Sequence, residues 1–189
     1  VELQNELANY VVPAAGNNGI MLQEKYNDNY KAKFDTTINY QKKGGLNLNR
    51  VFFIVTKNTA SASELLINSL KPYMDVKLVG KPSHGKPVGF FEIGVGDWYI
   101  FPVSFRSVNK NGEGNYFDGM QPDATVSDGL DKPWGDINED CLASALHYIN
   151  NGFFSRISSR VLDVKIETGN SVLDANNFKG AIDERRSLR

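Results

Sequence analysis

The chain has 189 residues, of which 41% are hydrophobic, and 21 Lys plus Arg oppose 22 Asp plus Glu for a net charge of −1. That length can bury a full hydrophobic core and fits one domain or slightly more. A near-zero charge without a dense basic run argues against nucleic acid as a partner. The lone Cys141 excludes an internal disulfide and any multi-cysteine zinc site.

Two further observations concern membranes and the start of the chain. No stretch of about 20 apolar residues occurs, so we expect no integral membrane span. The chain opens with Val-Glu-Leu-Gln, without a basic segment followed by an apolar one, so we expect no signal peptide within it. We interpret the sequence as a piece of a longer protein.

The first 45 residues predict one helix and one strand. Leu3, Leu7 and Tyr10 repeat at helical spacing, and Pro13 closes the stretch, which indicates a short amphipathic helix. Residues 16–45 are mostly polar. Within them, alternation over residues 33–40 predicts a strand.

Residues 51–80 predict a β-α-β unit. Val-Phe-Phe-Ile-Val at 51–55 is a continuous apolar run, typical of a strand buried on both faces in the centre of a parallel or mixed sheet. Residues 60–70 have helical periodicity and end before Pro72. Residues 76–80 then form a second strand.

A hairpin and a loop are expected next. Residues 90–95 and 98–108 predict two strands joined by a turn over 94–97, and residues 109–133 predict a loop rich in Gly, Asp, Asn and Pro. Four aromatic residues of the hairpin are expected in its core and in cross-strand pairs: Trp98, Tyr99, Phe101 and Phe105.

The sequence after the loop predicts one more helix and then a change of composition. Asp136 or Asn138 can cap a helix that runs through Cys141 and Ile149 and ends at residues 150–152, Asn-Asn-Gly. We expect residues 1–152 to form the main folded unit. Residues 153–189 read as a C-terminal extension, with one alternating run at residues 161–166.

The segment that can carry chemistry lies between the first strand of the β-α-β unit and its helix. Ser61 would present a hydroxyl at the sheet edge, and the Ala62 amide would point out of a positive helix N-terminus, which suits an oxyanion. A serine needs a base, and Lys86 on a later turn can serve if burial disfavours its ammonium form. Alternatively, Ser61 and Glu64 are only a capping box and Lys86 is a solvated loop lysine.

These residues resemble a known family. Residues 59–64, Thr-Ala-Ser-Ala-Ser-Glu, are similar to the Ser-Ala-Ser-Ala-Ser-Glu signature of the C-terminal processing (tail-specific) serine proteases, with Ser61 at the nucleophile position. Lys86 lies 25 positions later within Gly-Lys, as the family's base does. Residues 119–123 resemble its Gly-x-x-Pro-Asp segment, and residues 135–146 its closing Gly-Asp helix.

The resemblance implies a partial crotonase-like, ClpP-like α/β protease core, with residues 1–152 as the C-terminal portion of the catalytic domain. It implies a serine endopeptidase with a Ser-Lys dyad, Ser61 and Lys86, that cuts protein substrates near their C-termini without a cofactor or metal. The Ala62 amide would supply one oxyanion donor. An extracytoplasmic location, with a lipid anchor in missing upstream sequence, is also implied.

The sequence departs from the family in several places. Phe90 stands where some relatives place a glutamine that orients the lysine, so Glu64 is the remaining candidate for that role. His84 occupies a position where an aromatic residue is usual and could touch substrate or face solvent. The upstream Asp-Leu-Arg-x-Asn-x-Gly-Gly segment, which completes the oxyanion hole, and the PDZ-like domain are not found. We therefore expect weak or no activity from this chain alone.

Other functions stay open. A Ser-His-Asp triad would need His84 or His147, and His147 has the spacing of a packed or edge-exposed helix residue. The loop acids Asp118, Asp123, Asp128 and Asp131 lack the pattern of a calcium loop. The main alternative is a catalytically inactive peptide-binding or scaffolding module with the protease fold. A third option, another crotonase-like hydrolase or isomerase, requires an acyl-carrier site that the sequence does not reveal.

Overall fold

The computed structural model describes residues 2–129 and 131–155. The described chain contains both helices and strands, in agreement with the expected α/β class. The helical elements are α1 (Glu2–Val11), η1 (Ala14–Gly16), α2 (Lys31–Phe34), α3 (Ala62–Leu70) and α4 (Asp140–Asn151). The strands are β1 (Ile20–Lys25), β2 (Thr36–Asn39), β3 (Arg50–Val55), β4 (Asp75–Gly80), β5 (Val88–Phe90), β6 (Ile93–Val95), β7 (Trp98–Ile100), β8 (Val103–Val108) and β9 (Ala124–Thr125).

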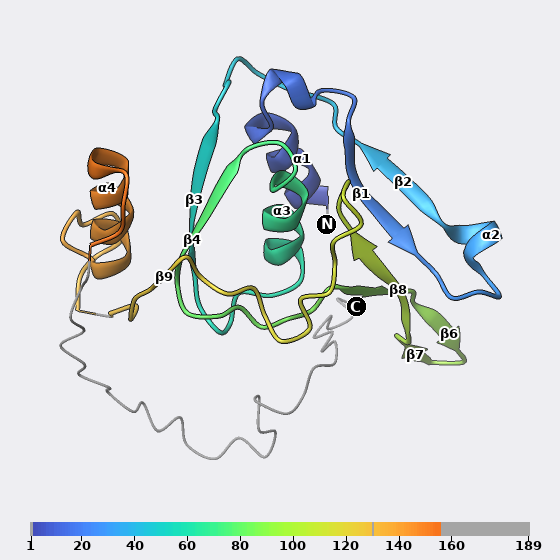
Figure 1. Ribbon diagram of the computed structural model, residues 1–189. Helices are drawn as coiled ribbons and strands as arrows, with labels where there is room; N and C mark the ends of the chain where they lie inside the picture. Colours follow the sequence, from blue (N-terminus) through green and yellow to red (C-terminus); the bar gives the residue numbers. More distant parts are fainter. Residues whose placement is uncertain (1, 130, 156–189) are drawn as a thin grey trace, which may run out of the picture.

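The elements stack in layers. Figure 1 shows α1 and α3 between a sheet that contains β3 and β4 and a second sheet that contains β1, β2 and β8, with α4 on the far face of the first sheet. Leu65, Leu66 and Leu70 of α3 join the core cluster that includes Met21 and Leu22 of β1. Helix α3 therefore has apolar contacts on both sides, which explains why nearly its whole length is buried.

The first sheet is parallel and has the order β3-β4-β9. Strands β3 and β4 pair from Arg50 opposite Asp75 to Val55 opposite Gly80, which confirms the predicted β-α-β unit. The prediction that β3 is central and buried on both faces was wrong. Among the described residues β3 is an edge strand, because no strand pairs along its other side, and Ile54 is 45% exposed.

The second sheet is antiparallel and has the order β2-β1-β8-β5. Strand β1 was missed from the sequence because its six residues, Ile-Met-Leu-Gln-Glu-Lys, do not alternate cleanly between apolar and polar. The strand predicted over residues 33–40 is shorter than expected. The chain first makes α2, and Asp35 then accepts a hydrogen bond from the Tyr26 backbone N–H at 2.9 Å, so that only Thr36–Asn39 remains extended.

The hairpin predicted from residues 90–108 divides into two parts. Strand β5 pairs with β8 inside the second sheet, whereas β6 and β7 form a separate two-stranded ribbon around Gly96. The expectation that Trp98 and Tyr99 are core residues was wrong, because the ribbon has no other layer against it among the described residues and Trp98 is 79% exposed. Phe105, in contrast, packs against Phe91 with ring centroids 6.0 Å apart.

Helices α1 and α4 form where expected, with differences in detail. The apolar stripe of α1 faces outward, with Leu3 82% exposed, because the helix packs on α3 through its small residue Ala8. Helix α4 ends at Gly152 as predicted, but its cap is Glu139 rather than Asp136 or Asn138. The Glu139 carboxylate accepts from two first-turn N–H groups at 2.8 and 2.9 Å.

The described residues contain no helix with the length and apolar character needed to cross a bilayer. The alternating run at residues 161–166 lies outside the described residues.

Candidate active site

Ser61 lies at a sharp turn between β3 and α3. The turn closes on itself, since the Thr59 N–H donates to the Thr56 carbonyl at 2.9 Å and the Thr56 N–H donates to Thr59 Oγ1 at 3.0 Å. Ser61 has φ 53° and ψ −111°, whereas an ordinary N-cap residue is extended. A positive φ in a residue with a Cβ costs on the order of 1–3 kcal/mol and is found mainly where function or the surrounding structure requires it.

The buried carboxylate of Glu64 holds this turn. Glu64 is 0% exposed, and its Oε2 accepts from the Ser61 backbone N–H at 2.9 Å, completing the capping-box return that the spacing predicts. The same oxygen accepts from the Lys86 backbone N–H at 2.8 Å. Oε1 accepts from the Ser83 hydroxyl and from the Gly85 N–H, both at 2.6 Å. One charge is thus shared among four donors, as a buried carboxylate requires.

Glu64 therefore does more than cap α3. From the sequence we expected it to orient the Lys86 side chain, but its hydrogen bond to Lys86 is to the backbone rather than to the amine. On the loop after β4 it accepts from the Ser83 hydroxyl and from the backbone N–H groups of Gly85 and Lys86. Glu64 joins the Ser61 turn to the lysine loop, which fixes where the two chain segments lie relative to one another.

Residues 119–123, the Gly-x-x-Pro-Asp segment, brace the lysine loop from its other side. The Met120 N–H donates to Ser83 Oγ at 2.7 Å, so the Ser83 hydroxyl links this segment to Glu64. The two segments approach each other closely. A Cβ on Gly85 would lie 2.3 Å from the Phe117 carbonyl oxygen, and a Cβ on Gly119 would lie 2.1 Å from the Ser83 carbonyl oxygen. Both glycines also have positive φ, so the crossing requires glycine twice.

Ser61, Ala62 and Lys86 open onto the same cavity, about 180 Å³ in volume, between α3 and the second sheet. Its walls are mainly apolar, and Glu24 and Lys86 are the charged residues among them. Ala62 is the first residue of α3, so its N–H has no acceptor within the helix. The other lining residues are Leu22, Leu65, Pro87, Val88, Gly89, Phe90, Phe105, Ser107 and Tyr116.

The Lys86 side chain contacts Phe90, the residue that stands in the glutamine position. The Lys86 ammonium nitrogen lies 5.1 Å from the Phe90 ring centroid, within the range of a cation–π interaction. Phe90 is itself held edge-on by Phe101, at 5.7 Å between centroids. An aromatic face attracts a cation, so this contact orients the side chain by a different interaction from the hydrogen bond that an amide would offer.

The remaining candidates lie elsewhere. His84 does not line the cavity, and its backbone N–H donates to the Thr59 carbonyl at 2.8 Å. His147 is on α4, where its ring Nδ1 lies 3.0 Å from the Phe153 carbonyl oxygen. Asp123 accepts from the Leu78 N–H at 2.7 Å and so supports β4. In the part of the chain that the structure describes, no group of three or more His, Cys, Asp or Glu side chains is placed to hold a metal ion.

Two ionisable residues of the cavity wall, Glu24 and Tyr116, were missed in the sequence. Burial raises the pKa of Glu24 above its usual range, against a smaller lowering by a hydrogen bond from Tyr26. Burial, with a smaller contribution from the Glu64 charge, raises the pKa of Tyr116. Finding Glu24 would have required prediction of β1 and its register against β8, where Glu24 pairs with Ser107. Tyr116 lies in a loop without a pattern that marks it.

Comparison of the sequence with models of protein families assigns the chain, with its strained serine turn and lysine loop, to a family. The model of peptidase family S41 matches residues 5–126, about two thirds of the chain. The chain belongs to peptidase family S41, and the resemblance to C-terminal processing proteases is confirmed at that level. No curated protein matches the sequence.

Solved structures support the same fold. A candidate S41 protease from Bacteroides fragilis is 24% identical with a TM-score of 0.71, over 79% of this chain and 41% of that protein. The photosystem II D1 C-terminal processing protease is 18% identical with a TM-score of 0.50, over 67% and 31% of the two chains. A lipoprotein from Streptococcus agalactiae is 16% identical with a TM-score of 0.51, over 66% and 44%. This chain thus spans less than half the length of each of these proteins.

Proposed function

We propose that the chain is part of a serine endopeptidase in which Ser61 is the nucleophile and Lys86 the general base. The observation that carries the proposal is that Ser61, Ala62 and Lys86 line one cavity while Glu64 bonds the backbones of Ser61 and Lys86. Residues 1–152 are proposed to be the C-terminal portion of the catalytic domain, and residues 153–189 an extension of it.

In the proposed reaction, Ser61 Oγ attacks a peptide carbonyl while neutral Lys86 Nζ takes the hydroxyl proton. The Ala62 N–H donates to the oxyanion that forms. Lys86 returns the proton to the leaving amine as the peptide C–N bond breaks, which leaves an acyl ester on Ser61. Lys86 then takes a proton from a water molecule that attacks the ester carbonyl. The acyl C–O bond to Ser61 breaks, the acid product leaves, and Lys86 returns the proton to Ser61 Oγ. Loss of one oxyanion donor costs about 10²- to 10³-fold in other enzymes, so a second donor from outside this chain would matter.

Cleavage of an unfolded protein by a form of the protein extended at its N-terminus, so that a second oxyanion donor can be present, tests this proposal. We expect mass spectrometry to find cuts, concentrated near substrate C-termini, that disappear in Ser61→Ala and in Lys86→Ala. Lys86→Arg should also be inactive, because a guanidinium does not give up its proton in this pH range. An active Lys86→Arg protein would refute the role of Lys86 as the base.

One contact favours a second candidate, a peptide-binding or scaffolding module without catalysis. Lys86 lies over the Phe90 ring in a cation–π contact, a role for the side chain that involves no proton transfer. On this alternative, Ser61→Ala leaves peptide binding unchanged and the folded wild-type protein cuts nothing. The dyad predicts instead that Ser61→Ala binds peptide but loses all turnover.

An extracytoplasmic location, with a lipid anchor outside this chain, is also part of the proposal. It is supported by the family resemblance and by the fold shared with a bacterial protein described as a lipoprotein. Cell fractionation with detection of the native protein tests it, and recovery in the cytoplasmic fraction would overturn it.

A further inference from the structure

Glu24 places a negative charge in the cavity that also holds Ser61 and Lys86. It lies on β1, opposite Ser107 of β8, and both residues line the cavity. The side chain is half-buried, and desolvation is the main reason that its pKa is raised. Burying a carboxylate costs free energy unless a cation or hydrogen-bond donors offset its charge.

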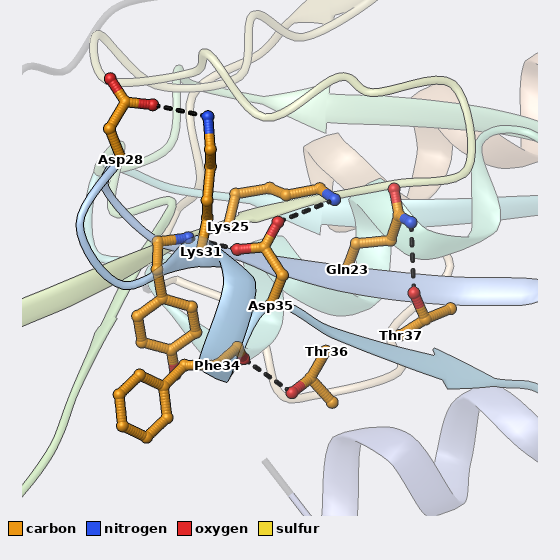
Figure 2. Close-up of polar contacts among 9 residues, drawn as sticks. Gln23, Lys25, Asp28, Lys31, Phe34, Asp35, Thr36 and Thr37 are labelled. Atoms are coloured by element: carbon orange, nitrogen blue, oxygen red, sulfur yellow. Dashed lines mark hydrogen bonds and ion pairs between the residues drawn. The ribbon is translucent and has the colours of Figure 1, made fainter.

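The described part of the chain does not supply a cation for Glu24. Its side-chain partner is the Tyr26 hydroxyl, at 3.4 Å. The neighbouring Lys25 pairs instead with Asp35, Nζ to Oδ2 at 3.2 Å, and Figure 2 shows Lys25 and Asp35 joined in this way. Lys86, the cationic residue of the cavity wall, stands over Phe90. No ion pair with Glu24 is found among the described residues.

The rest of the cavity wall is apolar and suits the aliphatic part of a long side chain. Leu22, Leu65, Val88 and Phe105 line it beside Glu24, and the volume of about 180 Å³ is that of a side-chain pocket rather than a cleft for a folded domain. When Lys86 is neutral, as the proposed reaction requires, Glu24 is the one remaining formal charge among the residues that line the cavity. An apolar wall with a carboxylate complements an apolar chain that ends in a cation.

We propose that Glu24 makes this cavity the binding subsite for a basic substrate side chain, lysine or arginine, near the scissile bond. The proposal rests on the proposed function. A substrate N-terminal ammonium has the same charge but lacks the aliphatic stem that the apolar walls would contact. The Tyr26 hydroxyl, which donates to the Glu24 carboxylate, can keep that hydrogen bond while the carboxylate binds the cation.

The test combines cleavage mapping with binding. The protein extended at its N-terminus and its Glu24→Gln variant are incubated with an unfolded protein, and cuts that depend on Ser61 are located by mass spectrometry. Lysine or arginine should be enriched about 10-fold at one position beside the wild-type cuts, which corresponds to one charge-assisted hydrogen bond. Enrichment should fall to background in Glu24→Gln and persist in Asp28→Asn, which neutralises an exposed carboxylate that pairs with Lys31.

Binding to the Ser61→Ala protein supplies the second readout. Calorimetry compares capped tripeptides with a central lysine, methionine or glutamate, whose blocked ends carry no charge. The lysine peptide should bind about 10-fold tighter than the methionine peptide, and Glu24→Gln should remove that difference. Equal binding, or the same difference in both proteins, overturns the subsite.

The two proposals fail in different ways. Cuts that depend on Ser61 but show no basic preference refute the subsite alone. A lysine preference in binding, without any cut that depends on Ser61, supports the subsite and refutes the catalytic role of Ser61. If the capped lysine peptide binds no tighter than the capped methionine peptide while an uncapped methionine peptide does, the N-terminal ammonium is the cation and the side-chain subsite is wrong.

Discussion

Replacing Glu64 by glutamine measures how strongly the candidate site depends on one carboxylate. The wild-type carboxylate accepts four hydrogen bonds, two on each oxygen. A glutamine keeps one acceptor oxygen and turns the other side into a donor. In its better orientation the oxygen serves the Ser61 and Lys86 N–H groups, the NH₂ group meets Ser83 Oγ, and the Gly85 N–H is left without an acceptor.

That arrangement allows an estimate of the cost. One buried donor without a partner costs about 1–3 kcal/mol, and the surviving bonds lose the strength that a charge gives them. We therefore expect Glu64→Gln to lower the free energy of unfolding by about 3 kcal/mol, a large part of the about 5–15 kcal/mol typical of a domain. Glu64→Ala removes all four acceptor contacts and should cost more.

Urea unfolding followed by far-UV circular dichroism is the suitable assay, because Trp98 and Trp134 are exposed and would report little of the core by fluorescence. The matched control is Glu113→Gln, an exposed glutamate whose carboxylate accepts from Asn109 Nδ2 at 2.8 Å. The control should change the unfolding free energy by less than about 0.5 kcal/mol. A similarly small change in Glu64→Gln would falsify the assignment of Glu64 as the residue that holds the site together.

Three further substitutions or measurements address other parts of the structure. Because Ser61 has a positive φ, Ser61→Gly should be more stable to urea than Ser61→Ala by about 1 kcal/mol. Gly85→Ala should lose more than about 3 kcal/mol, since its Cβ would meet the Phe117 backbone oxygen, whereas Gly112→Ala, also at positive φ but with open space around it, should lose only about 1 kcal/mol. Burial raises the pKa of the Cys141 thiol from 9.0 to about 12, so this thiol loses its proton at lower pH in the unfolded chain than in the folded one. The free energy of unfolding should therefore fall as the pH rises between these two values, and it should fall less steeply in Cys141→Ala.

Each of these three predictions can be contradicted by a specific result. Equal stability of the two Ser61 variants would mean that the turn is not strained. Equal losses in the two glycine variants would remove the argument for a close crossing at Gly85. For Cys141, rapid alkylation of the native protein near neutral pH would contradict its complete burial, because a thiol reacts as an accessible thiolate.

The β-α-β unit was predictable because two local signals agreed there. A continuous apolar run marked β3, and helical periodicity followed by Pro72 marked α3. The edge position of β3 was not predictable, since burial on both faces depends on strands elsewhere in space. Strand β1 was missed for a related reason, because its pairing with β8 involves residues about eighty positions away.

The candidate site was predicted in part. Spacing and family resemblance singled out Ser61, Ala62, Glu64 and Lys86, and the structure brings Ser61, Ala62 and Lys86 to one cavity. The capping-box spacing predicted one of the four Glu64 hydrogen bonds, that from the Ser61 N–H. The other three come from the loop after β4, whose path depends on the crossing with residues 117–120, and local sequence does not encode that crossing.

Three of the four groups that donate to the Glu64 carboxylate are main-chain N–H groups, and this affects how such a site can change in evolution. The carboxylate binds the backbone N–H groups of Ser61, Gly85 and Lys86, which every residue except proline possesses. The serine hydroxyl and the lysine amine can therefore be exchanged for other groups while the scaffold that positions them persists. A relative with other residues at these two positions would keep the same backbone arrangement around the cavity, so its chemistry could change while its fold stayed the same.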